Sequence, residues 1–309
     1  TNPQQALANL GAGVRPNLLI NAYFVGGGSQ QGGGQLPINQ RGQTSYSGTL
    51  NIFDRWYSPR ADLTVSLQSD GVLLSRATSQ NSSFYQKLQN RSQIGVFTFS
   101  ALVKGVAGNS IALQIGSTYI TTPYSGDWQI VQYTKTINSP SDWDASGING
   151  FIALYADYNS ASGGTTLIAA AKLEEGDGQT LAYQDESGAW QLLPQQDADY
   201  GAQLAQCQRY LVVLRGFGWI GSGVMDSSTQ GQFFIPLPVT MRTVPTISGT
   251  VRIYNYLNNL EGTEISASSI SSNGIHGFFK IGSGSTLSSG DAVFLWLNTD
   301  EQLIISAEL

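Results

Sequence analysis

The sequence contains one cysteine, Cys207, and one histidine, His276. A single cysteine cannot form an intrachain disulfide or supply a cysteine-based zinc site, and a single histidine excludes a metal site with several histidine ligands. No apolar run reaches the roughly 18 residues that a membrane-spanning helix needs, so we expect no membrane insertion.

Charge is also scarce. Only 12% of the residues are charged, and 15 lysines and arginines against 21 aspartates and glutamates give a net charge of −6. Nucleic-acid affinity comes mostly from contacts between phosphates and Lys or Arg side chains. Because no basic stripe occurs, we expect no nucleic-acid partner.

The sequence is rich in short apolar runs separated by turn residues. Hydrophobic residues make up 41% of the chain. The two faces of residues 96–103 carry Phe97, Phe99, Ala101 and Val103 on one side and Val96, Thr98, Ser100 and Leu102 on the other. Such alternation predicts a strand, and about eight strands over residues 18–173 predict an all-β sandwich or jelly roll.

A polar stretch with glycine and proline breaks follows at residues 174–196, and we expect a linker with a short hairpin near residues 183–193. The best helical pattern comes next, with Asp197 or Asp199 as its N-cap. Its apolar stripe has heptad-like spacing. The stripe consists of Tyr200, Leu204, Cys207 and Leu211. It either packs on its own domain or belongs to a small multi-helix contact.

Residues 212–309 return to strand-like runs, and we expect a second, smaller β-sandwich there. The segment 216–221 matches G-x-G-x-x-G, but no helical pattern follows it, so we interpret it as a glycine-rich aromatic turn rather than a nucleotide site. His276 lies in a turn-like context.

We expect no catalytic residue and no bound metal ion. Serine hydrolase chemistry needs a histidine base beside a nucleophile, and no G-x-S-x-G motif occurs. Glycoside hydrolysis needs only two carboxylates. The acidic pairs, all in turn-like or linker contexts, are Asp142/Asp144, Glu174/Glu175, Asp185/Glu186 and Asp300/Glu301. No cofactor is expected, although a structural calcium ion between jelly-roll loops stays an open alternative.

Aromatic side chains are the best candidates for ligand contact, because their faces match the apolar C–H faces of sugar rings. Packing in a core or an interface is the alternative for each ring. The candidate glycan contacts are Trp143, Tyr155 and Tyr158, with Tyr124 as a weaker one, in the first domain, and Trp219, Tyr254 and Tyr256 in the second. Trp56 and Trp128 lie in strand-like text, and we expect them in the core.

Several segments, in this order, resemble the C-terminal region of phage tail-fibre receptor-binding proteins. They are residues 6–11 (ALANLG), 17–24 (NLLINAYF), 39–42 (NQRG), 53–56 (FDRW), 99–105 (FSALVKG), 171–176 (AKLEEG), 204–210 (LAQCQRY), 234–247 and 306–309 (SAEL). The resemblance covers residues 6–309 and implies a carbohydrate-binding-module-like jelly roll, a linking helix and a C-terminal tip. The glycine-rich insert at residues 25–34 is longer than the link that usually joins the second and third of these segments. It is either an exposed binding loop or a slack linker.

The resemblance implies that these motifs have structural roles, and it does not locate a glycan-binding site. The resemblance implies a homotrimer, with the helical stripe at its threefold axis. The predicted organisation is a connector from a longer fibre at 1–16, a jelly roll at 17–176, a linker and helix at 177–212, and a tip at 213–309.

The predicted function is non-catalytic attachment of a virion to bacterial surface polysaccharide, acting outside the cell and joined to other tail proteins through the N-terminus. Two alternatives stay open, a structural trimeric connector without its own receptor site and a tail-associated glycan depolymerase. The host, the sugar and the domain that binds it are not defined by the sequence.

Overall fold

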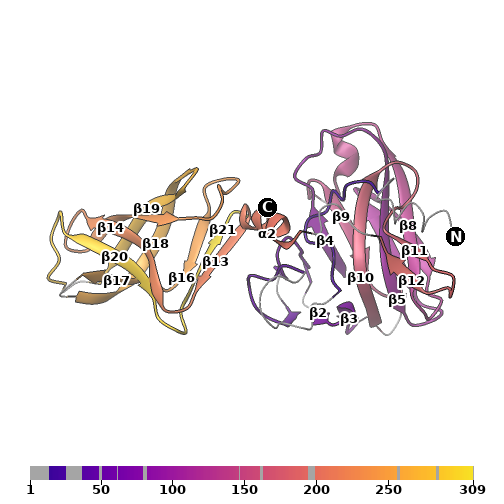
Figure 1. Ribbon diagram of the computed structural model, residues 1–309, viewed down its shortest axis with the longest axis horizontal. Coiled ribbons are helices and arrows are strands. Elements are labelled where there is room, and N and C mark those ends of the chain that lie inside the picture. Colours follow the sequence, from indigo (N-terminus) through magenta and orange to yellow (C-terminus); the bar gives the residue numbers. More distant parts are fainter. Residues whose placement is uncertain are drawn as a thin grey trace. The chain divides into compact units, whose positions relative to one another are not determined.

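The computed structural model describes residues 14–25, 37–48, 51–60, 62–78, 82–145, 147–160, 163–193, 199–255, 258–282 and 285–308. The chain forms two compact units, Thr1–Gln203 and Leu204–Leu309 (Figure 1). Regular structure in the described residues is almost entirely β. No helix within those ranges is long and apolar enough to cross a membrane. Most of the glycine-rich insert lies outside the described residues, so its predicted role is not addressed.

The first unit contains twelve strands and a short 3-10 helix among its described residues. They are β1 (Ser45–Ser47), β2 (Leu63–Gln68), β3 (Gly71–Arg76), β4 (Ser83–Lys87), β5 (Gly95–Gly105), β6 (Ser110–Ile115), β7 (Thr118–Pro123), β8 (Gln129–Ile137), η1 (Pro140–Trp143), β9 (Phe151–Tyr155), β10 (Gly164–Glu175), β11 (Ala182–Gln184) and β12 (Trp190–Leu192).

The strand order is that of a jelly roll. One antiparallel sheet runs β1-β2-β3-β10-β5-β8, and the other runs β4-β9-β6-β7. If β3 to β10 are counted as one to eight, the sheets read 1-8-3-6 and 2-7-4-5, with β1 and β2 added at one edge. This is the double Greek key that defines the fold. The predicted jelly roll is therefore confirmed, and its two sheets are visible in Figure 1.

The alternation in β5 places its apolar face in the core as predicted. Phe97, Phe99 and Val103 are almost completely buried between the sheets. The opposite face of β5 is covered too, because Leu102 packs with Ala169 and Ala170 of β10 beneath the hairpin formed by β11 and β12. The predicted hairpin near residues 183–193 is therefore present and covers part of the outer face of the larger sheet.

Asparagine, aspartate and tryptophan side chains near the N-terminus form a buried polar network. Asn21, at a positive φ of 57°, accepts a hydrogen bond from the Ile38 amide at 2.6 Å and donates to the carbonyl of Asp54 at 2.9 Å. The indole of Trp56 donates to the Asn21 carbonyl at 2.8 Å and stacks on Phe84 at 4.4 Å. Trp56 thus lies in the core, as predicted.

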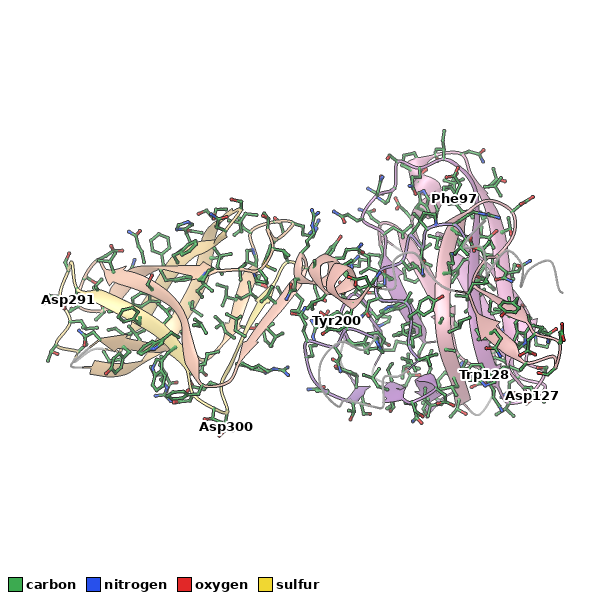
Figure 2. The ribbon with its side chains drawn as sticks, viewed as in Figure 1. Phe97, Asp127, Trp128, Tyr200, Asp291 and Asp300 are labelled. Carbon is green, nitrogen blue, oxygen red and sulfur yellow. The ribbon has the colours of Figure 1, made fainter. Side chains whose placement is uncertain are left out.

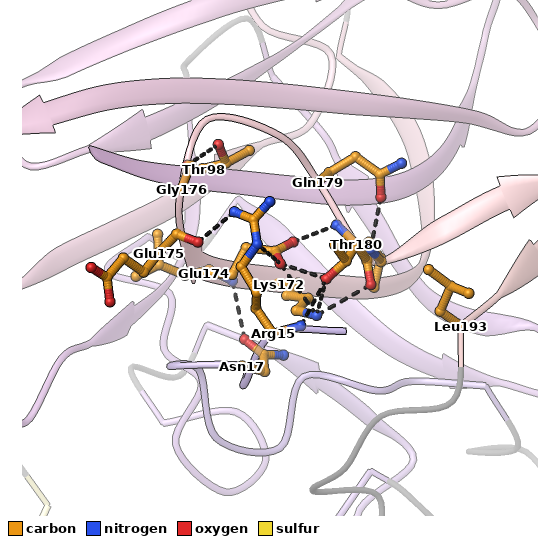
Figure 3. A network of polar contacts seen from close by, with 12 residues as sticks. Arg15, Asn17, Thr98, Lys172, Glu174, Glu175, Gly176, Gln179, Thr180 and Leu193 are labelled. Carbon is orange, nitrogen blue, oxygen red and sulfur yellow. Dashed lines mark hydrogen bonds and ion pairs between the residues drawn. The ribbon is translucent and has the colours of Figure 1, made fainter. Parts of the chain in front are cut away.

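A buried ion pair closes the end of β10. Lys172 Nζ lies 3.5 Å from Glu174 Oε2, and both side chains are fully buried. Thr180 links them, since its hydroxyl accepts from Lys172 at 2.7 Å and donates to Glu174 at 2.5 Å (Figure 3). Arg15 donates to the carbonyl of Glu175. Gly176 has a φ of +114°, a backbone conformation that residues with a side chain rarely adopt, so glycine is favoured there.

The second unit begins within α2 (Tyr200–Gln208), the α-helix of the described residues. Asp199 caps it, because its Oδ1 accepts the Ala202 amide at 2.7 Å; Asp197 lies outside the described residues. The predicted apolar stripe of the helix, which ran to Leu211, extends past the C-terminal end of α2. The helix ends before Leu211, which starts strand β13, so Leu211 is not on the same helical face as Tyr200, Leu204 and Cys207.

Six of the nine remaining described strands form a barrel rather than the predicted sandwich. The nine strands are β13 (Leu211–Arg215), β14 (Gly218–Met225), β15 (Gln230–Pro236), β16 (Thr246–Gly249), β17 (Arg252–Asn255), β18 (Asn258–Ser271), β19 (Gly274–Ile281), β20 (Ala292–Leu297) and β21 (Gln302–Ser306). Strands β14-β15-β19-β18-β17-β20 close on themselves because β14 also pairs with β20. A separate three-stranded sheet runs β13-β21-β16. Period-two patterning is identical in sandwiches and barrels, so the sequence did not distinguish them.

The Lys172→Met variant should be destabilised by about 3–5 kcal/mol, because it leaves the Glu174 carboxylate buried without its lysine partner. The matched control is Lys104→Met. Lys104 lies 3.6 Å from Asp127, and both side chains are exposed, so its loss should cost less than about 1 kcal/mol. Urea unfolding followed by tryptophan fluorescence measures both. Equal midpoints for the two variants would contradict the assigned role of the pair.

Candidate functional site

Five aromatic side chains gather on the outer face of the barrel, on β14, β17, β20 and the turn before β14. We call them the aromatic platform: Phe217, Trp219, Tyr254, Phe294 and Trp296. Phe217 is 72% exposed, Trp219 60% and Phe294 50%. Single exposed apolar side chains are ordinary, but a contiguous group of them usually marks a site of interaction.

Strand alternation explains why the rings point outward. In β20, Val293, Leu295 and Leu297 fill the barrel core, so Phe294 and Trp296 lie on the opposite face. In β17, Ile253 is buried and Tyr254 takes the outward position. The register sets Trp219 opposite Trp296 and Tyr254 opposite Phe294. Residues far apart in the sequence are thereby brought into one surface.

Trp219 is at the centre of the platform. Its ring centroid lies 5.3 Å from that of Tyr254, 5.3 Å from Phe294 and 5.9 Å from Trp296. Phe217 extends the surface through an edge contact with Trp296 at 5.0 Å. Aromatic pairs at these separations and tilts stabilise one another, so the platform is held in place before any ligand arrives.

Polar groups border the platform on one side. Arg252, which pairs with Trp296 across the strands, donates to Glu301 Oε1 at 2.9 Å and lies 3.9 Å from Glu261. Burial acts to raise the pKa of Glu301, but hydrogen bonds from the Asn298 amide and from Arg252 outweigh it and hold that pKa below its usual value. Glu301 is therefore a charged acceptor at neutral pH. The arrangement offers flat apolar faces beside a guanidinium and a carboxylate.

The segment 216–221, considered above as a nucleotide motif, is structural. Gly216 forms a turn with a φ of 82°, and Gly218 opens β14. A Cβ on Gly221 would lie 2.5 Å from the Phe234 carbonyl oxygen, so this glycine allows two strands to approach closely. His276 lies on β19 rather than in a loop, with its ring 4.8 Å from Phe234.

A second, smaller aromatic group lies on the jelly roll. Tyr158 lies 5.3 Å from Tyr119 and 5.7 Å from Tyr155, and Tyr155 donates to Gln114 Oε1 at 2.7 Å. A hydrogen bond with Tyr119 is the main cause that raises the pKa of Tyr158 to about 12. Tyr119, which is 50% exposed, was not among the candidates. The structure thus brings the predicted residues Tyr155 and Tyr158 together with Tyr119, which the sequence analysis did not select.

Trp143 was wrongly placed on the surface. It ends η1, is fully buried, contacts Phe97 at 4.8 Å and donates to the Gln93 carbonyl at 3.0 Å. The loop composition around it hides a capped 3-10 turn that directs the ring inward. Tyr124 is also buried, hydrogen bonded to Thr166. Neither residue can contact a ligand in this structure.

Two other predictions need separate comment. Trp128, assigned above to the core, is only partly buried and lies at the margin of the small cluster beneath the β11–β12 hairpin. Tyr256 lies outside the described residues. Sequence inspection missed Phe217, Phe294 and Trp296, although the alternation in residues 292–297 already indicated that Phe294 and Trp296 share a face.

No family model and no curated protein matches this sequence. Among solved structures, the apo form of BiXyn10A CBM1 has a TM-score of 0.31 at 13% identity, covering 45% of this chain and 96% of its own. A CBM4 structure gives 0.30 at 15% identity, covering 40% and 88%. The N-terminal cellulose-binding domain of Cellulomonas fimi β-1,4-glucanase C gives 0.29 at 12% identity, covering 40% and 90%.

Single replacements of Trp143 and Trp219 should distinguish a buried core residue from a surface residue by their effect on stability. Trp143→Ala should lower the free energy of unfolding by about 3–5 kcal/mol, because it removes a fully buried indole. Trp219→Ala should cost less than about 1 kcal/mol, because most of that ring is already in water. Chemical denaturation of the two variants measures the difference. A larger loss for Trp219→Ala would show that the platform is a structural element.

Proposed function

We propose that this chain is the host-recognising region of a phage tail fibre and that it binds bacterial surface polysaccharide without altering it. The observation that carries the glycan-binding part is the aromatic platform on the barrel. The phage part is supported by the order of sequence motifs, which span almost the whole chain.

The platform suits a sugar for a physical reason. The faces of pyranose rings present C–H groups, which pack on the electron-rich faces of Trp, Tyr and Phe. The hydroxyl groups at the ring edge require hydrogen-bond partners, and Arg252 and Glu301 are positioned beside Trp296 to supply a donor and an acceptor. Trp219, in contact with three other rings, is the expected anchor.

The acidic side chains support a non-catalytic role. Asp144 is paired with Arg91 at 2.7 Å, Glu174 is buried against Lys172, and Glu301 is held by Arg252. Asp142 accepts the backbone amides of Asn138 and Ser139, which hold its pKa below the usual value. A general acid requires a carboxyl whose pKa is raised. Asp142 and Glu301 instead have lowered pKa values, and all four groups make contacts that hold the fold together.

Trimer formation fits the same function. Shallow sites bind single sugars weakly, and joining three of them on one particle raises the effective affinity without any new contact. In this proposal the chain is a homotrimer, joins other tail proteins through its N-terminal side, and acts on the virion outside the cell. Tyr200 and Leu204, which are partly exposed, are the proposed trimer contact, whereas Cys207 is completely buried within the chain and cannot reach a neighbouring subunit.

One alternative has an observation in its favour. An exposed apolar surface can equally be an interface between subunits, and the chain would then be a structural connector of the tail tip. The depolymerase alternative requires a free pair of carboxylates, and the engaged acids above give it no support.

Binding of fluorescently labelled protein to a panel of bacterial strains and their purified polysaccharides tests the proposal. Trp219→Ala should weaken binding about tenfold or more, since a central aromatic anchor contributes about 2 kcal/mol. The control is Phe278→Ala, an exposed ring on β19 outside the platform, which should bind as the wild type does.

Light scattering of the same variants separates the two functions. Retained oligomeric state with lost binding supports glycan recognition. A changed oligomeric state in Trp219→Ala, with no wild-type binding to any strain, favours the connector.

A further inference from the structure

The jelly roll carries a groove that the proposed function does not use. It has a volume of about 670 Å³ and lies where the β11–β12 hairpin meets the outer face of the larger sheet. Pockets that hold small ligands have volumes of roughly 300–1,000 Å³ and combine apolar walls with a few polar groups. This groove has both properties.

The floor and walls come from separate parts of the first unit. Leu102 of β5 and Ala169 of β10 are lining residues contributed by the sheet. Trp190 and Leu192 of β12 form one wall. The remaining lining residues include Trp128 and Asp127, labelled together in Figure 2, and Asp70 from the turn between β2 and β3. One indole ring from strand β12 and one from the segment just before β8 therefore border one cavity.

Local hydrogen bonds hold both walls in place. In the hairpin, Asp185 accepts the amides of Ser187 and Ala189 and the side-chain amide of Gln191 at 2.9 Å. The hydrogen bond from the Ser187 hydroxyl is the largest cause that holds the pKa of Asp185 below its usual value, so the carboxylate stays charged in this turn at neutral pH. On the other side, Gln129 binds the Ser125 amide and the Pro123 carbonyl. The groove is therefore pre-formed, which limits the entropy lost on binding.

The charges at the groove select the class of ligand. Asp70 and Asp127 are lining residues, and no lysine or arginine is among the described residues that line the groove. Lys104, which is not a lining residue, lies 3.6 Å from Asp127. A carboxylate accepts hydrogen bonds from sugar hydroxyls or amines and repels uronic acids, sialic acids and phosphates. The two indoles offer stacking faces for pyranose rings.

We propose that this groove is a second carbohydrate site, which takes an oligosaccharide segment free of carboxylate and phosphate groups. The groove proposal takes only the class of ligand from the proposed function. Its residues and its structural unit differ from those of the platform. Trp128 and Trp190 provide the stacking faces, and Asp70, Asp127 and Gln191 bind the hydroxyl or amine groups.

A glycan array carrying neutral, amine-bearing and acidic bacterial oligosaccharides tests the groove. The variants are Trp128→Ala, Trp190→Phe and Asp127→Asn, each made in the wild type and in Trp219→Ala. Trp190→Phe keeps an apolar ring on the hairpin, so that loss of the indole is tested without removing the hairpin's packing. Val106→Ala, an exposed apolar side chain that is not a lining residue, is the control.

We expect Trp219→Ala to retain binding to a subset of non-acidic glycans, and Trp128→Ala to reduce that residual binding about tenfold. Titration with the bound glycan should change tryptophan fluorescence in Trp219→Ala, and the change should be lost in the double variant with Trp128→Ala. The control Val106→Ala should leave both signals unchanged.

The outcomes separate the two proposals. The groove proposal fails if Trp219→Ala abolishes all binding or if only acidic glycans bind. The platform proposal is then decided separately, by comparing Trp219→Ala with Phe278→Ala. If Trp128→Ala abolishes binding and Trp219→Ala has no effect, the platform fails and the groove stands. Binding unchanged by every groove variant overturns the groove proposal.

Discussion

Each strand of the barrel has to bury one face, and this constraint determines where its aromatic residues lie. The interior is tightly filled. A Cβ on Gly223 would lie 2.3 Å from the Gln232 carbonyl oxygen, and one on Gly277 would lie 2.0 Å from that of Ser266. Alternation then directs Phe294 and Trp296 outward. It fixes their position but not their identity, because polar side chains would serve equally well on that face. Three adjacent strands that all carry rings there require a separate reason, and ligand contact provides one.

The residues that carry the resemblance to tail-fibre proteins have architectural roles in the structure. Asn21, Asp54 and Trp56 belong to one buried hydrogen-bonded network, and Glu174 and Gly176 close the end of β10. Such residues are constrained by burial and by backbone geometry, so they preserve a fold whatever its surface binds. The platform lies outside these motifs, and Leu102 is the one groove residue discussed above that lies within one of them, at residues 99–105. The motifs alone could therefore not have located either surface.

The parts of the fold that were predictable depend on local pattern. Alternation in β5 predicted a strand and its buried face, and Asp199 caps the helix as its side chain allows. The errors come from long-range contacts. Trp143 is buried because a capped 3-10 turn brings it to Phe97 and Gln93, which lie about fifty residues earlier. Leu211 continues the heptad spacing, but pairing with Ser306 in β21 makes it a strand residue. Barrel closure depends on pairing between β14 and β20, which no local pattern specifies.

In the proposed function, the low charge of the chain limits how it can recognise a cell surface. With a net charge of −6, the protein gains no long-range attraction to anionic polysaccharides. Recognition then depends on short-range stacking and hydrogen bonds, which pre-formed aromatic surfaces provide at small entropic cost. A shallow platform and an open groove would each bind a sugar weakly and release it readily. In the proposed trimer, repetition of these weak contacts would supply the retention that single sites lack.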